Sequence, residues 1–172
     1  MRAAMRRVPS TVTVVTAAGA DEARGITIGS FTSVSLDPPL ICFNVQKEAQ
    51  MHPLITTTPR FAVHILNDEQ VHLSDHFAVP DRTGAEQFAG VPYRREADGL
   101  PILDDALAVF HCRLYAIYEA GDHSIILGEV VDVEVAGEGG PVLYYERTYR
   151  GLGETLQPRQ PASVNGVSGE SP

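Results

Sequence analysis

The strongest constraint on the fold is a regular alternation of apolar and polar residues in two consecutive segments. Apolar side chains occupy every second position of residues 108–118, and most of residues 123–135 follow the same pattern. Successive side chains of a β-strand point to opposite faces, so this period of two predicts strands rather than helices. The turn formers Gly121 and Asp122 separate the segments. The pattern therefore predicts a hairpin of two long antiparallel strands.

Other parts of the chain contain shorter segments of the same kind. β-branched and apolar residues predict strands at 8–18, 25–36, 40–45, 60–66 and 141–145. Residues 1–7 are predicted to be the end of a short helix. Two further short helices are predicted at 48–57 and 68–77, and Asn67 or Asp68 should cap the second. The prolines of Asp37-Pro38-Pro39 should break the sheet. Many short strands with few helices predict a mainly β fold, an antiparallel barrel with a few short flanking helices.

Length and composition favour one soluble domain with its own core. The chain has 172 residues, of which 44% are hydrophobic, and its formal net charge is −9. No apolar run approaches the ~20 residues of a membrane-spanning helix, so no membrane and a cytoplasmic location are expected. The acidic balance disfavours binding of nucleic acid. Residues 78–105 are irregular, with one helical turn at 85–88, and the Pro-, Gly- and Ser-rich residues 154–172 are predicted to be a disordered tail.

Thiols and imidazoles give no clear metal site. Cys42 and Cys112 each lie in an apolar strand-like segment, which favours two reduced core thiols over a disulfide or a redox pair. His72 and His76 are four residues apart on a predicted helix, a spacing suited to metal ligation, but no third ligand is evident. A solvated helix face is the better interpretation, and no metal is predicted.

The segment 25–47, GITIGSFTSVSLDPPLICFNVQK, has the composition of a binding surface. Its first strand carries glycines and hydroxyl residues where a core strand would carry Val, Ile and Leu. Glycine allows close approach to the backbone, while hydroxyls and amides supply hydrogen-bond donors, so a planar heterocycle such as a flavin could bind there. An exposed sheet face without a ligand explains this strand equally well. The Pro-Pro pair, the apolar strand and Lys47 beside a predicted helix start favour a ligand with a phosphate.

Sequence motifs of several other enzyme classes are absent. The chain contains neither a GxGxxG after a strand nor a P-loop or a GxSxG elbow, which disfavours a Rossmann fold, a P-loop NTPase and an α/β-hydrolase. The Gly121-Asp122-His123 triplet before SIILGEV is open to two interpretations. Asp122 and His123 either cap an exposed hairpin turn or contribute to a site.

Two of these segments, in this order, resemble a known family. The segment GITIGSFTSVSLDPPLICFNVQK and the later GDHSIILGEV are similar to the signatures of the flavin reductase-like domain, the reductase component of two-component flavin-dependent monooxygenases. RFAVHIL and LSDHFA stand between them in the family's order. The resemblance covers residues 1–153. It implies a split antiparallel β-barrel, a homodimer, and flavin bound near the subunit interface.

The resemblance also implies roles for particular residues. It places His123 at the pyridine nucleotide, where it would position the nicotinamide. It places the flavin ring, its ribityl chain and its phosphate against two strands and one helix. The implied flavin-binding residues are Thr27, Ile28, Gly29, Ser30, Thr32, Asn44, Val45, Gln46, Lys47 and Phe77.

The implied activity is NAD(P)H:flavin oxidoreduction, with hydride passing from nicotinamide C4 to flavin N5. The cofactors are FAD or FMN together with NADH or NADPH, and NADH is favoured because no arginine cluster marks a 2′-phosphate site. The implied partner is a flavin-dependent monooxygenase that receives the reduced flavin by diffusion. Two alternatives remain: a non-catalytic flavin-binding or redox-sensing module, and an oxidase resembling the pyridoxamine phosphate oxidases.

Overall fold

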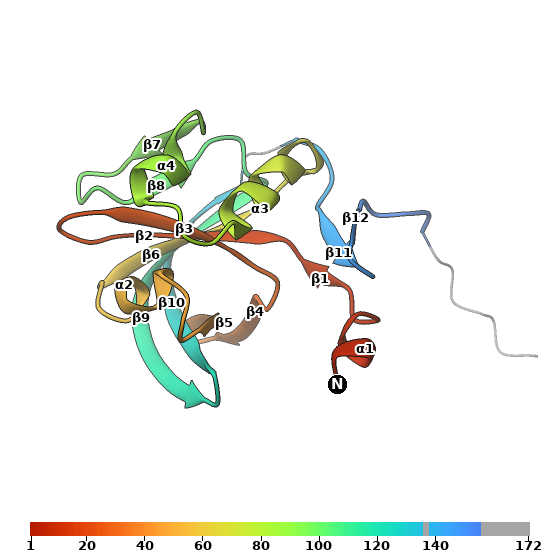
Figure 1. Ribbon diagram of the computed structural model, residues 1–172, viewed down its shortest axis with the longest axis horizontal. Helices are drawn as coiled ribbons and strands as arrows, with labels where there is room; N and C mark the ends of the chain where they lie inside the picture. The colour runs from red at the N-terminus through yellow and green to blue at the C-terminus, as the bar shows by residue number, and fades with distance from the viewer. Residues whose placement is uncertain (136–137, 156–172) are drawn as a thin grey trace, which may run out of the picture.

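The computed structural model describes residues 1–135 and 138–155, and strands dominate it (Figure 1). One seven-stranded sheet has the order β3-β2-β6-β9-β10-β5-β4, with all neighbours antiparallel. Its strands are β2 (Thr13–Ala18), β3 (Ala23–Ile28), β4 (Thr32–Leu36), β5 (Pro39–Gln46), β6 (Arg60–Ile65), β9 (Ala108–Ala120) and β10 (His123–Val135). The prediction of a mainly β, antiparallel fold is therefore confirmed.

The two edge strands of this sheet, β3 and β4, are consecutive in the chain. Only residues 29–31 join them, and a chain of that length spans at most about 14 Å from Ile28 to Thr32. The sheet must therefore curl until its edges approach each other, although β3 and β4 do not pair and the barrel stays open. The prediction of a single strand over 25–36 is wrong, because the chain leaves one edge at Ile28 and joins the other edge at Thr32.

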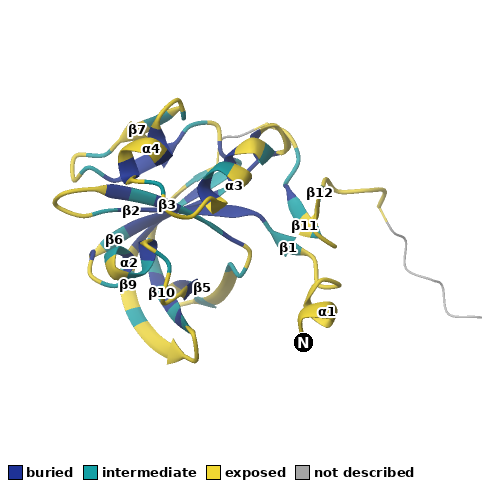
Figure 2. Cartoon of the chain, viewed as in Figure 1, coloured by how far each residue is buried: buried dark blue, intermediate teal, exposed yellow. Residues whose placement is uncertain are grey.

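The long hairpin predicted from the alternating pattern is confirmed. β9 and β10 pair from Ala108↔Val135 to Ala120↔His123, with register shifts at Leu127/Gly128 and at Val130/Asp132. A Cβ on Gly128 would lie 2.3 Å from Cζ of Phe61, so only glycine lets β10 pass this buried ring. Beyond the shifts, Val133 and Val135 are exposed. At the other end of the hairpin, next to the turn, the last residues of β9 are exposed as well (Figure 2).

Two hydrophobic clusters form most of the core. The first lies within the curled sheet, with side chains from β2, β5, β6, β9, β10 and the helix α2 (Met51–Ile55). Phe43 and Phe61, both fully buried, meet edge to face in it. The second cluster lies beneath α3 (Val71–Ala78) and α4 (Gly84–Phe88), where Phe77 packs against Phe88. This second cluster fixes α3 against β3.

The remaining elements surround the sheet. A small sheet joins β1 (Ser10–Thr11), β11 (Leu143–Tyr145) and β12 (Thr148–Arg150), and a hairpin joins β7 (Tyr93–Arg95) and β8 (Pro101–Leu103). The helix α1 (Arg2–Met5) precedes β1, and the turn η1 (Asp68–Gln70) precedes α3 with the predicted cap, Asn67. Within the described ranges, no helix has the length and apolar character needed to cross a bilayer.

Several predicted boundaries need correction. The segment 8–18 is two strands in different sheets, and residues 93–103 of the supposedly irregular excursion form the β7–β8 hairpin. Asp37-Pro38-Pro39 does not break the sheet: Asp37 and Pro38 form a tight turn, and Pro39 begins β5 opposite Leu36. A proline is tolerated at the first position of a strand. Of the tail predicted at 154–172, only residues 154 and 155 fall within the described ranges.

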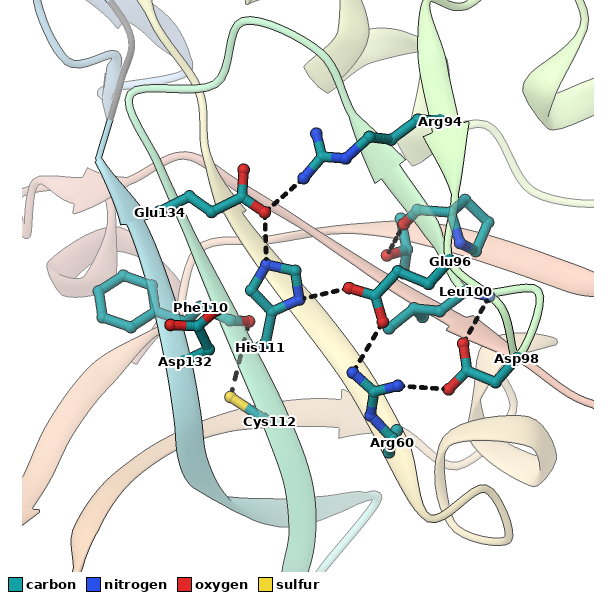
Figure 3. A network of polar contacts seen from close by, with 12 residues as sticks. Arg60, Arg94, Glu96, Asp98, Leu100, Phe110, His111, Cys112, Asp132 and Glu134 are labelled. Carbon is teal, nitrogen blue, oxygen red and sulfur yellow. Dashed lines mark hydrogen bonds and ion pairs between the residues drawn. The ribbon is translucent and has the colours of Figure 1, made fainter.

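A network of ion pairs and hydrogen bonds joins the β7–β8 hairpin to the main sheet (Figure 3). His111 of β9 is buried, with Nδ1 2.9 Å from Glu96 Oε1 and Nε2 2.8 Å from Glu134 Oε1. Arg60 of β6 lies 2.7 Å from Glu96 through Nη2. A guanidinium lies beyond each carboxylate, because Arg60 pairs with Glu96 and Arg94 pairs with Glu134, so both carboxylates have partners on two sides.

Candidate functional site

The open side of the curled sheet contains a pocket of about 760 Å³ between β3 and the β5–β10 pair. It is lined by Met1, Met5, Ile26, Thr27, Ile28, Gly29, Ser30, Asn44, Gln46, Ala49, Ala120, His123 and Ile125. Seven of these are sequence-predicted site residues, drawn from both signature segments. Segments nearly a hundred residues apart thus meet at one pocket.

The β3 wall of the pocket is fixed by hydrogen bonds that turn away from it. Thr27 Oγ1 donates to the Ser74 carbonyl of α3 at 2.7 Å. The Ile28 carbonyl accepts from Thr13 Oγ1 of β2 at 2.9 Å. The Thr27 hydroxyl and the Ile28 carbonyl are therefore used to hold β3 in place, which leaves close backbone approach as the contribution of this wall to a ligand.

The opposite wall is the edge of β5 that faces away from β10. β4 pairs with β5 only as far as Cys42, so the edge beyond it has no strand partner. The Asn44 N–H donates to Ser30 Oγ at 2.9 Å, which ties the two walls together. Backbone groups alternate in direction along a strand, so the Gln46 N–H also points away from β10 and toward the opening. The Gln46 carbonyl accepts from the Ala49 N–H at 3.0 Å.

A second pocket, of about 410 Å³, continues from the first and shares Ile26, Thr27, Gln46 and Ala49 with it. Phe77 lines this pocket from α3, although its side chain is only 2% exposed. A Cβ on Gly25 would lie 2.5 Å from two carbons of the Phe77 ring, so glycine is needed for that ring to reach β3. Phe77 therefore shapes the wall between the pocket and the core.

His123 lies at the end of β10, in register with Gln46 of β5. Its Nδ1 is 2.7 Å from Asp122 Oδ1, and its side chain is 42% exposed. The hydrogen bond from His123 lowers the pKa of the Asp122 carboxyl below its ordinary value. This pair orients the ring at the rim of the pocket and leaves Nε2 for a ligand.

Three predicted residues do not line either pocket. The Lys47 ammonium pairs with Glu119 on the β9–β10 hairpin and lowers the pKa of that carboxyl. Val45 is fully buried in the first core cluster, so only its backbone is near the site. Thr32 is exposed on β4. The predicted helix start beside Lys47 lies further on, because α2 begins at Met51.

Sequence reasoning also missed residues that line the pockets. Met1 and Met5 reach the first pocket from α1, and Ala49 lies between the two pockets. Arg24 of β3 lines the second pocket, its side chain 12% exposed. The N-terminal methionines carried no periodic signal, whereas Arg24 could have been noted as a cation directly before the glycine-rich strand.

His76 and the two cysteines show no sign of a metal or redox role. His76 is bonded through Nε2 to the Gln87 carbonyl at 2.7 Å and through Nδ1 to Arg82 at 2.9 Å. Among residues 1–135 and 138–155, no group of three His, Cys, Asp or Glu side chains could hold a metal ion. Both cysteines are free, and burial raises the pKa of the Cys112 thiol to about 12.

Comparison with known proteins gives a consistent result. The family model "Flavin reductase like domain" matches residues 5–153. A curated "NADH-dependent FAD reductase" of Streptomyces globisporus is 45% identical over 76% of this chain and 74% of its own. The reductase component of 4-hydroxyphenylacetate 3-monooxygenase from Thermus thermophilus is 38% identical over 87% and 93%.

Solved structures agree with the sequence comparisons. The S. globisporus NADH:FAD oxidoreductase SgcE6, in complex with NAD and FAD fragments, superposes with a TM-score of 0.82 at 37% identity. The match covers 91% of this chain and 93% of that one. Family model, relatives and fold agree, and the resemblance noted from the two signature segments is confirmed: the chain belongs to the flavin reductase like domain family.

Proposed function

We propose that the protein is an NAD(P)H-dependent flavin reductase whose flavin ring binds in the pocket between β3 and β5. The reaction is NAD(P)H + flavin + H⁺ → NAD(P)⁺ + reduced flavin. The observation that carries the proposal is the meeting of the two signature segments at this pocket, with backbone edges on both walls and His123 at the rim. NADH and FAD or FMN are the expected reactants, as in the named relatives.

The residues of the pocket fit a flavin. The small residue Ala49 leaves room for a flat ring beside Ile26 and Ile125, whose apolar side chains line the same pocket. The Gln46 N–H at the open edge of β5 can donate to the polar edge of the ring, where negative charge develops on reduction. When bound, the flavin supplies N5 as the hydride acceptor.

The chain's own contribution is orientation. His123, held by Asp122, positions the amide or ring of the nicotinamide over the pocket. The Ser30–Asn44 hydrogen bond keeps the two walls at a fixed separation. No nucleophile is required, because hydride transfer depends on holding two rings in contact. Lys47 is retained as a candidate for the flavin phosphate, which its ammonium can reach only by leaving Glu119.

The open, curled sheet supports a split barrel that is completed in a homodimer. Apolar side chains are exposed on β4 and on the far part of β10: Val34, Leu36, Val131, Val133 and Val135, with Leu36 90% exposed. Exposed apolar side chains of this kind favour burial against a second copy. The proposed partner is a flavin-dependent monooxygenase in the cytoplasm, which would receive reduced flavin by diffusion.

The test is an NADH oxidation assay with FAD, FMN and riboflavin in parallel. The proposal predicts that each protein molecule oxidises many molecules of NADH with at least one of the flavins. The oxidation is measured as the loss of NADH absorbance. Saturable flavin binding without NADH turnover would instead identify a flavin-binding or redox-sensing module. Sedimentation analysis tests the dimer, and Leu36→Asp should shift the protein toward monomer.

A further inference from the structure

Exposed arginines gather on the helix α1 and on the small sheet of β1, β11 and β12. Three come from the first seven residues and two from β12 and the turn before it: Arg2, Arg6, Arg7, Arg147 and Arg150. The pairing of β1 with β11 brings the two segments together, and the Glu146 N–H donates to the Arg6 carbonyl at 3.1 Å. We call these five arginines the basic patch.

The basic patch has a charge opposite to that of the rest of the protein. Residues 1–11 and 143–150 contain five arginines and a single acidic residue, Glu146, which gives a local charge of +4. The remaining residues contain eight Lys and Arg against 21 Asp and Glu, a charge of −13. An approaching anion is therefore repelled by most of the protein and attracted by the basic patch.

Most of this positive charge is not neutralised by the protein. Glu146 Oε1 lies 3.0 Å from Nη1 of Arg7. In the part of the chain that the structure describes, the other four arginines form no ion pair. The attraction of a distant ligand depends on where these charges lie in the fold rather than on one side-chain conformation, because it acts over about a Debye length.

The basic patch borders the pocket proposed for the flavin ring. A third pocket, of about 490 Å³, is lined by Arg2, Arg6 and Arg147, and it shares Met1 and Met5 with the first pocket. The helix α1 therefore contributes its methionines to both pockets and its arginines to the third. Figure 1 shows α1 on the same side of the molecule as β1, β11 and β12. An anion that is attracted to the patch arrives next to the first pocket.

We propose that the basic patch attracts phosphate-bearing ligands from solution and steers them into the adjoining first pocket. The inference rests on the proposed function, whose reactants FMN, FAD and NADH all carry phosphate groups and are anions. The patch acts on the rate at which these ligands arrive, and no contact in the bound complex is assigned to it. Electrostatic steering of this kind raises association rates by about 10- to 1,000-fold.

The direction of the salt effect separates steering by the patch from the effect of the net charge. Raising the salt concentration from about 10 mM to about 1 M shortens the Debye length from about 30 Å to about 3 Å. If the net charge of −9 controlled the approach of FMN, screening would remove a repulsion and association would become faster. If the patch controls it, screening removes an attraction and association becomes slower.

The first test measures the association rates of FMN and of riboflavin by stopped-flow flavin fluorescence over this range of salt. In the wild type, FMN association should slow about tenfold as salt is raised. Riboflavin has the same ring without the phosphate, so its rate should change by less than about twofold. A decrease for riboflavin as large as that for FMN would overturn the proposal, because riboflavin carries no charge.

Two double variants with the same change in net charge locate the effect. Arg6→Gln/Arg147→Gln removes one charge from each segment of the patch, and at low salt it should slow FMN association about fivefold. The control is Arg95→Gln/Arg113→Gln, since both of these arginines are exposed and neither lines the first or the third pocket. Each FMN rate is divided by the riboflavin rate of the same variant, which corrects for any change in the pocket. Equal effects of the two double variants would overturn the patch.

A third measurement identifies which anion is steered. With riboflavin as the acceptor, kcat/KM for NADH reports the arrival of the reductant. If kcat/KM decreases with salt and in Arg6→Gln/Arg147→Gln, the patch also steers NADH; if only FMN responds, it steers the flavin. The proposal is overturned if neither ligand responds. Reduction of riboflavin by NADH tests the proposed function separately, so the two failures can be distinguished.

Discussion

His64 of β6 and His123 of β10 belong to the same sheet but lie in contrasting surroundings. His64 is fully buried, with Nδ1 2.9 Å from the Val14 carbonyl and Nε2 accepting from the Leu103 N–H at 3.1 Å. His123 is half exposed and is bonded through one nitrogen only, to Asp122. The first ring has both of its hydrogen-bonding groups committed to the fold, and the second keeps one for a ligand.

The same contrast extends to the regions around the two rings. Around His64 and His111, ion pairs and hydrogen bonds join β6, β9 and the β7–β8 hairpin into a sealed layer. Figure 3 shows the part of this layer around His111. Around His123, the bonds Thr27–Ser74 and Asn44–Ser30 fix the walls of a pocket and leave strand edges open. Polar groups therefore stabilise the fold in the first region, whereas in the second they fix the positions of the strands that line the pocket.

The largest expected effect is on the sealed side. His64→Leu leaves the Val14 carbonyl and the Leu103 N–H without their partner, which should lower the free energy of unfolding by about 2–4 kcal/mol. Chemical denaturation measures the loss. His72→Leu, an exposed histidine bonded to the Glu69 carbonyl, is the control and should change stability by under ~1 kcal/mol. Equal effects at the two positions would contradict the sealed layer.

The pH dependence of stability should distinguish the two histidines next. Burial lowers the pKa of His64 to about 4, below the ~6.5 of the unfolded chain. The folded state therefore binds fewer protons than the unfolded state between these values, so stability is lost as the pH falls from 7 to 4. One pKa unit corresponds to about 1.4 kcal/mol, which gives a loss of about 3 kcal/mol. In His64→Gln this part of the loss should be missing.

On the open side, His123→Ala should affect the substrate rather than the fold. We expect the Michaelis constant for NADH to rise about tenfold, the equivalent of one lost orienting contact, while flavin affinity and the melting temperature change little. Steady-state kinetics with varied NADH and then varied flavin measure both. Unchanged kinetics would remove His123 from the site.

The smallest expected effect concerns Lys47. Its ammonium is already paired with Glu119, so Lys47→Met should weaken the binding of FMN by only about threefold. The binding of riboflavin, which lacks the phosphate, should be unaffected. The comparison is between Michaelis constants for the two flavins. Equal losses for FMN and riboflavin would refute a phosphate contact.

Sequence patterns within short segments predicted the elements whose structure depends on neighbouring residues. The alternation over 108–135 gave the β9–β10 hairpin, and Asn67 gave the start of η1 and α3. The division of 25–36 into β3 and β4 could not be predicted in this way, because it depends on which distant strands cover each half. Residues 29–31 instead carry the chain between the two edges of the sheet.

The sequence predicted most of the residues that line the site but not the directions of their side chains. Both signature segments reach the pocket, yet the direction of Lys47 depends on Glu119, more than seventy residues away. Met1 and Met5 enter the pocket because β1 pairs with β11, a contact that the sequence does not signal. Side-chain direction and long-range pairing were thus the missing information.

The most direct test of the central claim, that the flavin ring binds between β3 and β5, is a riboflavin titration followed by flavin fluorescence. Ala49→Trp places a large ring between the two pockets, and Ala97→Trp places the same ring on the exposed turn of the β7–β8 hairpin. With both variants folded, we expect at least tenfold weaker riboflavin binding in Ala49→Trp and wild-type affinity in Ala97→Trp. Wild-type affinity in Ala49→Trp would contradict it.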